Sequence, residues 1–130
     1  RPACTVETKP HFFIKEETRL TPCLQREYKN TPIGGNSDKY FNLSRPGIDK
    51  PAPTITQMGG SPAAGVVHPL EERKLSIAEL KRLCAFPDDF ILTGSYAKQW
   101  ERLGRAVPPV MMMHIGQTIQ TEILNKIKEA

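Results

Sequence analysis

Few residues in this sequence have the types and spacing that catalysis requires. Cys23, in the stretch TPCLQ, is a candidate nucleophile, and with His68 it would form the reactive pair of a Cys/His hydrolase. A reactive thiolate needs a neighbouring base or helix terminus that lowers its pKa, and the residues around Cys23 supply neither clearly. The adjacent Asp88 and Asp89 are typical of turns and helix caps rather than of an acid/base pair. We therefore expect no catalytic residue in this chain.

The histidines and cysteines also lack the spacing of metal ligands. Each of the three histidines stands alone, and the sequence contains neither a CxxC nor an HxxxH pattern. Three well-separated cysteines argue against a disulfide framework and for a reducing cytoplasm. The longest apolar run, Ala106 to Met113, is too short to span a bilayer. We expect a cytoplasmic protein with no metal and no membrane partner.

Length, charge and the first residue narrow the possibilities further. A chain of 130 residues can bury one modest core, which is one domain or a piece of one. The formal net charge of +4 is a weak indication of a polyanionic partner. The chain begins at Arg1 instead of a methionine, so we expect a processed or trimmed product of something longer.

The first half of the chain is rich in turn-forming residues. The stretch NTPIGGNSDK (30–39) combines Pro, Gly, Asn and Asp, which favour turn geometry. Segments 39–43, 53–56 and 66–68 contain aromatic and β-branched residues and are predicted to be short strands. The loop QMGGSPAAG (57–65) separates the last two segments. These patterns predict a small, irregular β region.

The second half is predicted to be helical. Ser76 and Glu79 have the spacing of a capping box, which indicates a helix start, and the Phe-Pro pair at 86–87 would end that helix. Ser95 can cap a second helix. Gly104 suits the left-handed position just past the end of that helix.

A third helix is predicted to begin at Pro108 or Pro109, because proline is tolerated in a first turn. Isoleucines repeat every four residues along it, at positions 115, 119, 123 and 127. The run Met111 to Met113 lies on this helix and is expected to pack into the core. The predicted fold class is α+β, with an irregular β region followed by three C-terminal helices.

Three segments of the sequence occur in the order and spacing of a known family. RKLSIAELKRLCAFPDDF (73–90) and ERLGRAVPPVMMMHIGQTI (101–119) resemble the ninth and tenth conserved motifs of DNA cytosine-5 methyltransferases. DKPAPTITQMGG (49–60), followed by His68 and Pro69, is similar to the end of that family's target-recognition domain. The resemblance covers about residues 39–128.

The family's catalytic motifs do not occur in this sequence. Neither a Pro-Cys-Gln nor a Glu-Asn-Val motif is present, nor is the glycine-containing cofactor loop. The resemblance therefore implies the C-terminal portion of an enzyme, or the small subunit of a split one, that is inactive alone. Residues 1–72 would belong to the target-recognition domain and residues 73–130 to a C-terminal helical segment. Both would normally dock on a Rossmann-like domain that uses S-adenosylmethionine.

The resemblance also implies which residues contact double-stranded DNA. Thr54 would donate its hydroxyl to a phosphate, and Gln57, Gly59 and Gly60 would form a base-reading loop in which Gln57 reads adenine. An ordinary strand threonine and an ordinary hairpin loop are the alternatives.

Other charged residues fall near these positions. Arg45 and Lys50 are candidate phosphate neutralisers, or else solvated loop charges. For Arg73 and Glu79 we favour a structural ion pair over contact with DNA.

The junction between the last two helices would line the S-adenosylmethionine pocket through Arg105, Ala106 and Val107. Arg105 stands where the family has an asparagine. Arginine cannot accept hydrogen bonds, so it would face a DNA phosphate or the donor's carboxylate instead. The alternative is a plain turn whose Val107 fills the core.

The function implied is the target-recognition and cofactor-pocket part of a DNA cytosine-5 methyltransferase from a bacterial or phage restriction-modification system. The N-terminal catalytic domain, or a large subunit, would be its protein partner. The main alternative is a stand-alone, sequence-specific DNA-binding or regulatory module without catalysis.

Overall fold

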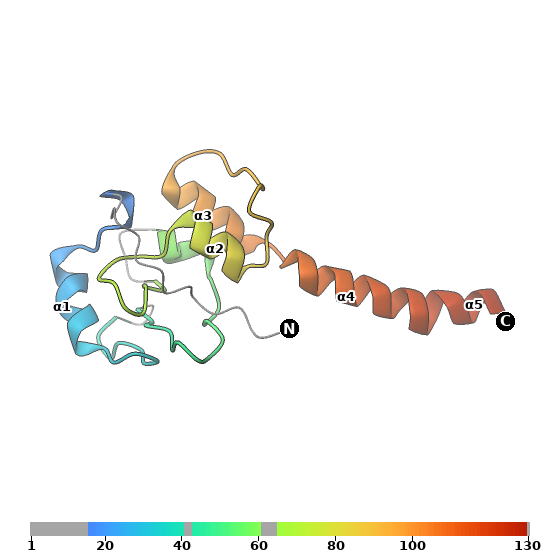
Figure 1. The fold of residues 1–130 in the computed structure, drawn as a ribbon, viewed down its shortest axis with the longest axis horizontal. Coiled ribbons are helices and arrows are strands. Elements are labelled where there is room, and N and C mark those ends of the chain that lie inside the picture. The colour runs from blue at the N-terminus through green and yellow to red at the C-terminus, as the bar shows by residue number, and fades with distance from the viewer. Residues whose placement is uncertain (1–15, 41–42, 61–64, 130) are drawn as a thin grey trace.

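The computed structural model describes residues 16–40, 43–60 and 65–129. Its helices follow in the order α1 (Pro22–Asn30), α2 (Ile77–Leu83), α3 (Tyr96–Arg105), α4 (Pro109–Ile119) and α5 (Asn125–Glu129). The 3-10 turn η1 (Glu16–Thr18) precedes α1, the 3-10 turn η2 (Gln57–Gly60) lies between α1 and α2, and the π-helical turn η3 (Gln120–Leu124) lies between α4 and α5. A rounded body ends with α3, and a rod made of α4, η3 and α5 projects away from it (Figure 1).

Helix α1 lies where the sequence predicts little regular structure. Pro22 occupies its first turn, where a missing N–H group costs nothing. Leu24 and Tyr28, one turn apart, are buried, and the Tyr28 hydroxyl donates to the carbonyl of His68 at 3.1 Å. A single apolar pair is too short a pattern to predict a helix from the sequence. A helix of this length is marginal by itself, and the packing of this pair against the body stabilises α1.

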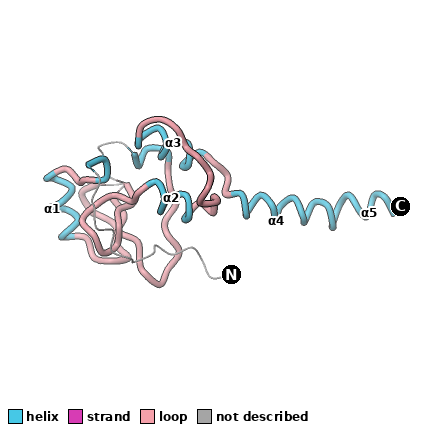
Figure 2. The backbone as a smooth tube through the Cα atoms, turned by 45° about the horizontal axis from the view of Figure 1, so that its top comes forward, coloured by secondary structure: helices cyan, strands magenta, loops and turns pink. Residues whose placement is uncertain are grey.

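The predicted β region is wrong in its secondary structure. Among the described residues the chain makes isolated β-bridges and no named strand, and Figure 2 shows this part as loops. Segment 53–56 belongs to no regular element and makes no β-bridge, and within 39–43 positions 41–42 lie outside the described residues. Val66 and Val67 each make one bridge, to Ser44 and Lys74 respectively. Prolines at 51 and 53 lack the N–H group that a ladder needs, so extended segments here do not pair.

The body contains two clusters of buried side chains. The first joins α2 and α3 and consists of Val66, Leu75, Leu80, Cys84, Tyr96, Trp100 and Leu103. The second lies around α1 and consists of Leu20, Leu24, Tyr28, Leu43 and Val67. The adjacent residues Val66 and Val67 enter different clusters, because side chains alternate along extended backbone. This alternation ties the two halves of the body together.

Helix α2 begins as the sequence predicts. Ser76 is its N-cap, and both hydrogen bonds of the capping box with Glu79 are present. The helix ends one turn before Phe86, and Ala85 takes a left-handed conformation with φ of 59°.

Helix α3 begins after Ser95, whose side chain makes no capping hydrogen bond. Its end contradicts the sequence prediction, because Gly104 lies inside the helix and the C-cap is Ala106. The reason for a glycine at position 104 is therefore a close contact, described below, rather than a left-handed turn.

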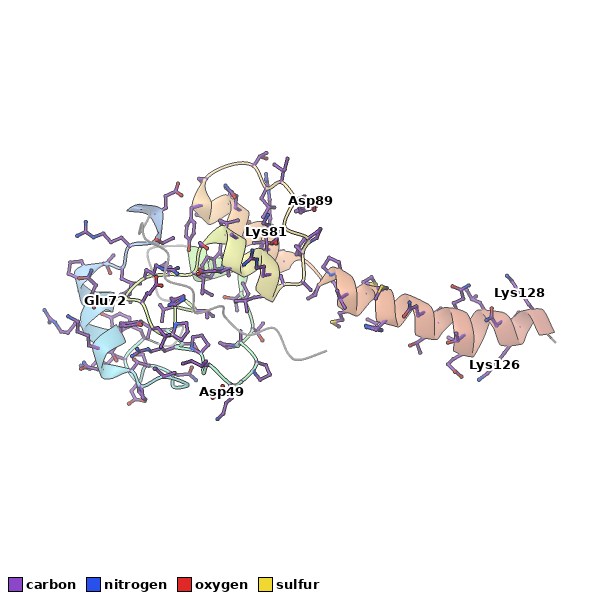
Figure 3. All side chains as sticks on the ribbon, viewed as in Figure 1. Asp49, Glu72, Lys81, Asp89, Lys126 and Lys128 are labelled. Atoms are coloured by element: carbon purple, nitrogen blue, oxygen red, sulfur yellow. The ribbon has the colours of Figure 1, made fainter. Side chains whose placement is uncertain are left out.

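The rod begins at Pro109, in the predicted place. None of the residues of α4 is buried, which contradicts the expectation that the methionines fill the core. Met111, Met112 and Met113 are each at least half exposed. Side chains spread from all sides of the rod, with Lys126 and Lys128 near its far end (Figure 3). In the described part of the chain no helix combines the length and apolar character that crossing a membrane requires.

Candidate functional site

The turn η2 is fixed onto α3 by a tryptophan. The indole Nε1 of Trp100, a fully buried side chain, donates to the carbonyl oxygen of Thr56 at 2.9 Å. A Cβ atom at Gly59 would lie 2.5 Å from the indole ring, and one at Gly60 would lie 2.8 Å from the Cβ of Trp100. The two glycines therefore allow the turn to lie against the tryptophan. This packing accounts for both glycines without the approach to DNA that the sequence suggested.

Gly104 provides the second contact between α3 and the turn. A Cβ atom at Gly104 would lie 2.5 Å from both the backbone nitrogen of Gln57 and the carbonyl carbon of Thr56. Backbone atoms cannot move aside as a flexible side chain can. Only glycine allows α3 to approach the turn so closely, which explains the glycine at this position.

The side chains of Gln57 and Arg105 meet above this contact. Arg105 Nε donates to Gln57 Oε1 at 2.6 Å, and Arg105 Nη2 lies 3.1 Å from Glu101 Oε1 one turn earlier on α3. Lys98 Nζ lies 3.0 Å from the other oxygen of Glu101. Hydrogen bonding to Lys98 and the charges of Lys98 and Arg105 lower the pKa of Glu101. Gln57, predicted to read DNA, and Arg105, predicted to line the cofactor pocket, are therefore in direct contact.

A shallow hollow of about 320 Å³ accompanies this set of side chains. It is lined by Gln57, Met58, Ala97, Lys98, Glu101 and Arg105. Charged and amide groups lie around an apolar floor, so the hollow can offer hydrogen bonds to a polar ligand edge.

A neighbouring groove of about 370 Å³ brings Thr54 and Ala106 together. Its wall is formed by segment 51–55 on one side and by the junction after α3 on the other, with Leu83, Cys84 and Leu103 beneath. Thr54 is exposed, while its neighbour Ile55 packs against the core. Val107 is 51% exposed, so it does not fill the core as the alternative required. The groove is mostly apolar and contains no acidic side chain.

Arg45 is used inside the body. Its Nε donates to Pro69 O at 2.8 Å and its Nη1 to Thr31 O at 3.0 Å, while the guanidinium lies 4.2 Å from the ring centre of Tyr28. These contacts link three segments and so give Arg45 a structural role, while its contact with phosphate stays a prediction. Lys50, by contrast, is exposed just before the groove segment.

Arg73 and Glu79 form a buried, two-pronged ion pair. Arg73 Nη1 and Nη2 lie 2.9 Å and 2.8 Å from the two carboxylate oxygens of Glu79. Burial would raise the pKa of Glu79, but the hydrogen bonds from Arg73 and Ser76 outweigh it and lower the pKa to about 2. Burial also disfavours the charge of Arg73, yet its hydrogen bonds to Glu79 and Glu71 hold its pKa above the ordinary value. The pair supports the start of α2.

Lys74 is a residue that the sequence did not single out. It is buried, and its Nζ donates to the carbonyl of Gly59 at 3.1 Å, which holds the turn η2 from below. Burial lowers the pKa of Lys74 to about 8. Nothing in the local pattern indicates this role, because a lysine between Arg73 and Leu75 is ordinarily a surface residue.

The structure does not assemble a Cys/His pair from Cys23 and His68. Cys23 is exposed on α1. His68 is fully buried, and its Nδ1 accepts from the backbone N–H of Glu71 at 2.9 Å.

The other titratable groups show no further reactive arrangement. Asp88 pairs with Arg82, with 3.0 Å between Oδ1 and Nε, and Figure 3 shows Asp89 in the loop beyond α2. No group of three or more His, Cys, Asp or Glu side chains that could hold a metal ion occurs among residues 16–40, 43–60 and 65–129.

Comparison with known proteins gives one family. The model of the family described as C-5 cytosine-specific DNA methylase matches residues 6–121. The chain is 28% identical over 135 residues to type II methyltransferase M.AquIB of Picosynechococcus sp., an alignment that covers 92% of this chain and 95% of that relative. No solved structure matches the chain.

Two further relatives are much longer than the part they share with this chain. One is a putative type II methyltransferase of Oceanobacillus iheyensis, 33% identical over 86 residues, or 66% of this chain and 18% of the relative. The other is a putative type II methyltransferase of Methanocaldococcus jannaschii, 30% identical over 89 residues, or 68% of this chain and 27% of the relative. The chain thus spans nearly all of one relative and less than a third of these two.

Proposed function

The chain belongs to the family of C-5 cytosine-specific DNA methylases, and from this premise we propose that it forms the DNA-recognition and cofactor-facing wall of a methyltransferase active site. The reactive wall, with its nucleophilic cysteine, lies in a further polypeptide stretch. The sequence contains no Pro-Cys-Gln motif, and the described cysteines are an exposed one on α1 and a buried one after α2.

The chemistry explains why such a wall is needed. The target carbon of cytosine is inaccessible in a duplex, so the base must leave the stack before it reacts. The enzyme must then hold the backbone and the flanking bases around the gap. Phosphate contacts fix the register, and base-edge contacts select the sequence.

The DNA-facing part would be the edge formed by Lys50, Thr54 and Gln57. All three are exposed, and Thr54 and Gln57 lie on either side of the anchored Ile55. Lys50 would neutralise a phosphate, and the Thr54 hydroxyl would donate to a phosphate beside the target. The buried ion pair of Arg73 with Glu79 and the anchors Trp100 and Lys74 would hold this edge in place without touching DNA.

The cofactor-facing part would be the extended junction at Ala106 and Val107. The adjoining groove offers small and apolar surface, which fits one wall of a pocket for S-adenosylmethionine. The groove contains no carboxylate that could accept hydrogen bonds from the ribose hydroxyls of the cofactor. The contacts with the ribose must therefore come from the catalytic part. When bound, the cofactor supplies the methyl group. Ala106 and Val107 would exclude water and form one side of the space beside the extruded base.

The observation that carries the proposal is the exposed apolar rod. Helix α4 has no buried residue. Its large apolar side chains are all at least 36% exposed, namely Val110, Met111, Met112, Met113, Ile115 and Ile119. Contiguous apolar surface of this kind ordinarily marks an interaction site. We propose that the rod docks on a Rossmann-like catalytic domain and so joins the two walls.

The relatives support an enzyme over a stand-alone DNA-binding module. The relative that aligns over 95% of its own length is named a type II methyltransferase. We therefore favour a chain that works within a restriction-modification methyltransferase, in the cytoplasm, with double-stranded DNA as substrate.

The test is to find the catalytic part and measure its dependence on this chain. The coding region upstream is sequenced for Pro-Cys-Gln and Glu-Asn-Val motifs, and that polypeptide is produced with the chain. We expect 5-methylcytosine in duplex DNA, detected by mass spectrometry. A chain that binds one duplex sequence tightly by itself, with no such partner, would support the stand-alone module instead.

A further inference from the structure

We infer that Arg105 is a positioning residue for DNA recognition, which orients the amide of Gln57 so that it presents hydrogen-bond donors to a guanine in the target site. The inference rests on the proposed function, since it requires Gln57 to face the DNA. It assigns the arginine to the recognition edge rather than to the cofactor wall.

The orientation of the amide follows from the chemistry of the pair. A guanidinium has donors and no acceptor, so Arg105 can hold the Gln57 side chain only through its oxygen. The 2.6 Å contact between Arg105 Nε and Gln57 Oε1 is such a bond. With its oxygen bonded to Arg105, the amide has its nitrogen and two N–H groups to offer to a ligand.

The arginine is itself held in place. Its Nη2 lies 3.1 Å from Glu101 Oε1, on the preceding turn of α3. Three side chains on two elements therefore form a connected set, in which Glu101 fixes Arg105 and Arg105 fixes Gln57. Ordering a long side chain before binding reduces the entropy that binding must overcome.

The backbone beneath the pair is equally constrained. Trp100 donates to Thr56 O at 2.9 Å, next to Gln57, and Gly104 lies directly against the Gln57 nitrogen. The Cα atoms of Gln57 and Arg105 thus belong to one packed unit. The orientation of the Gln57 amide is set by this unit rather than by a mobile loop.

The donors select a particular base edge. Guanine presents two acceptors, O6 and N7, in the major groove, whereas cytosine presents a donor. Adenine presents one acceptor and one donor, and its bidentate recognition needs the glutamine oxygen, one lone pair of which already accepts from Arg105. Thymine presents the single acceptor O4. Guanine is therefore the base that offers an acceptor to each of the two N–H groups of this amide. This reverses the expectation, from the sequence alone, that Gln57 reads adenine.

The test is a selection of duplexes from a randomised pool by the assembled enzyme, followed by sequencing of the bound fraction. Gln57→Glu keeps an acceptor for Arg105 and removes both donors. It should reduce the preference for guanine at one position by about 10-fold or more. Arg105→Ala keeps the donors but releases the amide. It should let adenine compete with guanine at that same position, with the KM for S-adenosylmethionine unchanged.

Arg102→Ala is the matched control. Arg102 lies on the same helix and donates to Thr93 O, away from the turn η2, so its removal should leave the base preference unchanged. A preserved guanine preference in Gln57→Glu would overturn the inference. So would an Arg105→Ala enzyme with unaltered preference and a raised KM for the cofactor, because that result places Arg105 in the cofactor wall.

The wild-type enzyme separates this inference from the function it rests on. Selective binding of duplexes without any methylation would overturn the proposed function. The base preferences of the Gln57 and Arg105 variants would still test the orientation of the amide. Methylation with no guanine preference that depends on Gln57 would overturn the inference alone.

Discussion

Gln57 and Arg105 are 48 positions apart in the chain, and their side chains are joined by a hydrogen bond of 2.6 Å. The bond joins the turn η2 to the last turn of α3, and Gly104 and Trp100 lock the backbone below it. The glycine near the end of α3 is therefore explained by a contact with a distant segment. The glycine leaves room for the turn, and the arginine holds the side chain of Gln57.

A glycine-to-alanine pair tests this contact. In an exposed helix, alanine in place of glycine stabilises by about 1 kcal/mol. At Gly104 the new Cβ would instead lie 2.5 Å from two backbone atoms of the turn, so Gly104→Ala should lower the free energy of unfolding. The control is Gly116→Ala in α4, where a Cβ would meet nothing within 4 Å and helicity should rise. Urea denaturation and circular dichroism measure both, and a stabilising Gly104→Ala would refute the close contact.

Removing the buried carboxylate should destabilise the body strongly. Glu79→Gln can keep the capping geometry but leaves the buried Arg73 with the partly exposed Glu71 as its remaining counter-charge. We expect a loss of about 1–3 kcal/mol in the free energy of unfolding, measured by urea denaturation at pH 7, because Arg73 loses one of its two charged partners. Glu101→Gln, in an exposed ion pair, should change little. Equal losses in the two variants would contradict the structural role of the buried pair.

The same carboxylate predicts acid sensitivity with a definite sign. The folded-state pKa of Glu79 is lowered from 4.5 to about 2, so its contribution is complete above about pH 4.5 and is lost as the pH falls toward 2. The stability difference between the wild type and Glu79→Gln should therefore narrow between pH 5 and about 2.5. Denaturation curves at several pH values measure it, and a constant difference would argue against the lowered pKa.

Lys74 predicts the opposite behaviour in alkali. Burial lowers its pKa from 10.5 to about 8, so the cost of burying the charge is complete below about pH 8 and disappears as the pH rises to 10.5. Relative to Lys74→Met, the wild type should gain stability over this interval. The exposed Lys50, changed to Met, should show no such trend. A parallel pH profile for Lys74→Met and the wild type would mean that the ammonium is not buried.

A structural feature could be predicted from the sequence only where the residues that determine it are close together along the chain. The start of α2 was predicted because Ser76 and Glu79 interact three positions apart, and the start of α4 because Pro109 acts through its own backbone. Gly104 was given a local role, at a helix end, and that was wrong because its reason lies at Gln57. The pairing of Gln57 with Arg105 could not be predicted, since no local rule relates the two.

The errors elsewhere have similar causes. Helix α1 was missed because only Leu24 and Tyr28 mark its buried face, and the predicted strands lack the partners that would make them a sheet. The methionines of α4 were expected in the core because an apolar helix is usually buried within its own chain. Here the surface of the methionines is exposed, and we propose that a partner protein covers it.

The apolar rod can be tested by placing charges on one of its faces. Ile115 and Ile119 lie one turn apart on α4, so lysines at both positions would interrupt a single apolar stripe. Since α4 has no buried residue, the thermal unfolding of the body should not change. Association with the catalytic part, measured by calorimetry, should weaken at least about 10-fold if the stripe is desolvated on docking. Lysines at Gln117 and Thr121, on the other side, are the matched control, and equal effects from both pairs would argue against a docked face.

The central claim is that this chain is one wall of an active site whose reactive wall lies elsewhere. The direct measurement is the transfer of radiolabelled methyl groups from S-adenosylmethionine to duplex DNA by three samples: the chain alone, the catalytic polypeptide alone, and the two together. We predict 5-methylcytosine only in the third sample. Methyl transfer by the chain alone, or full and equally selective transfer by the catalytic polypeptide without it, would contradict the account.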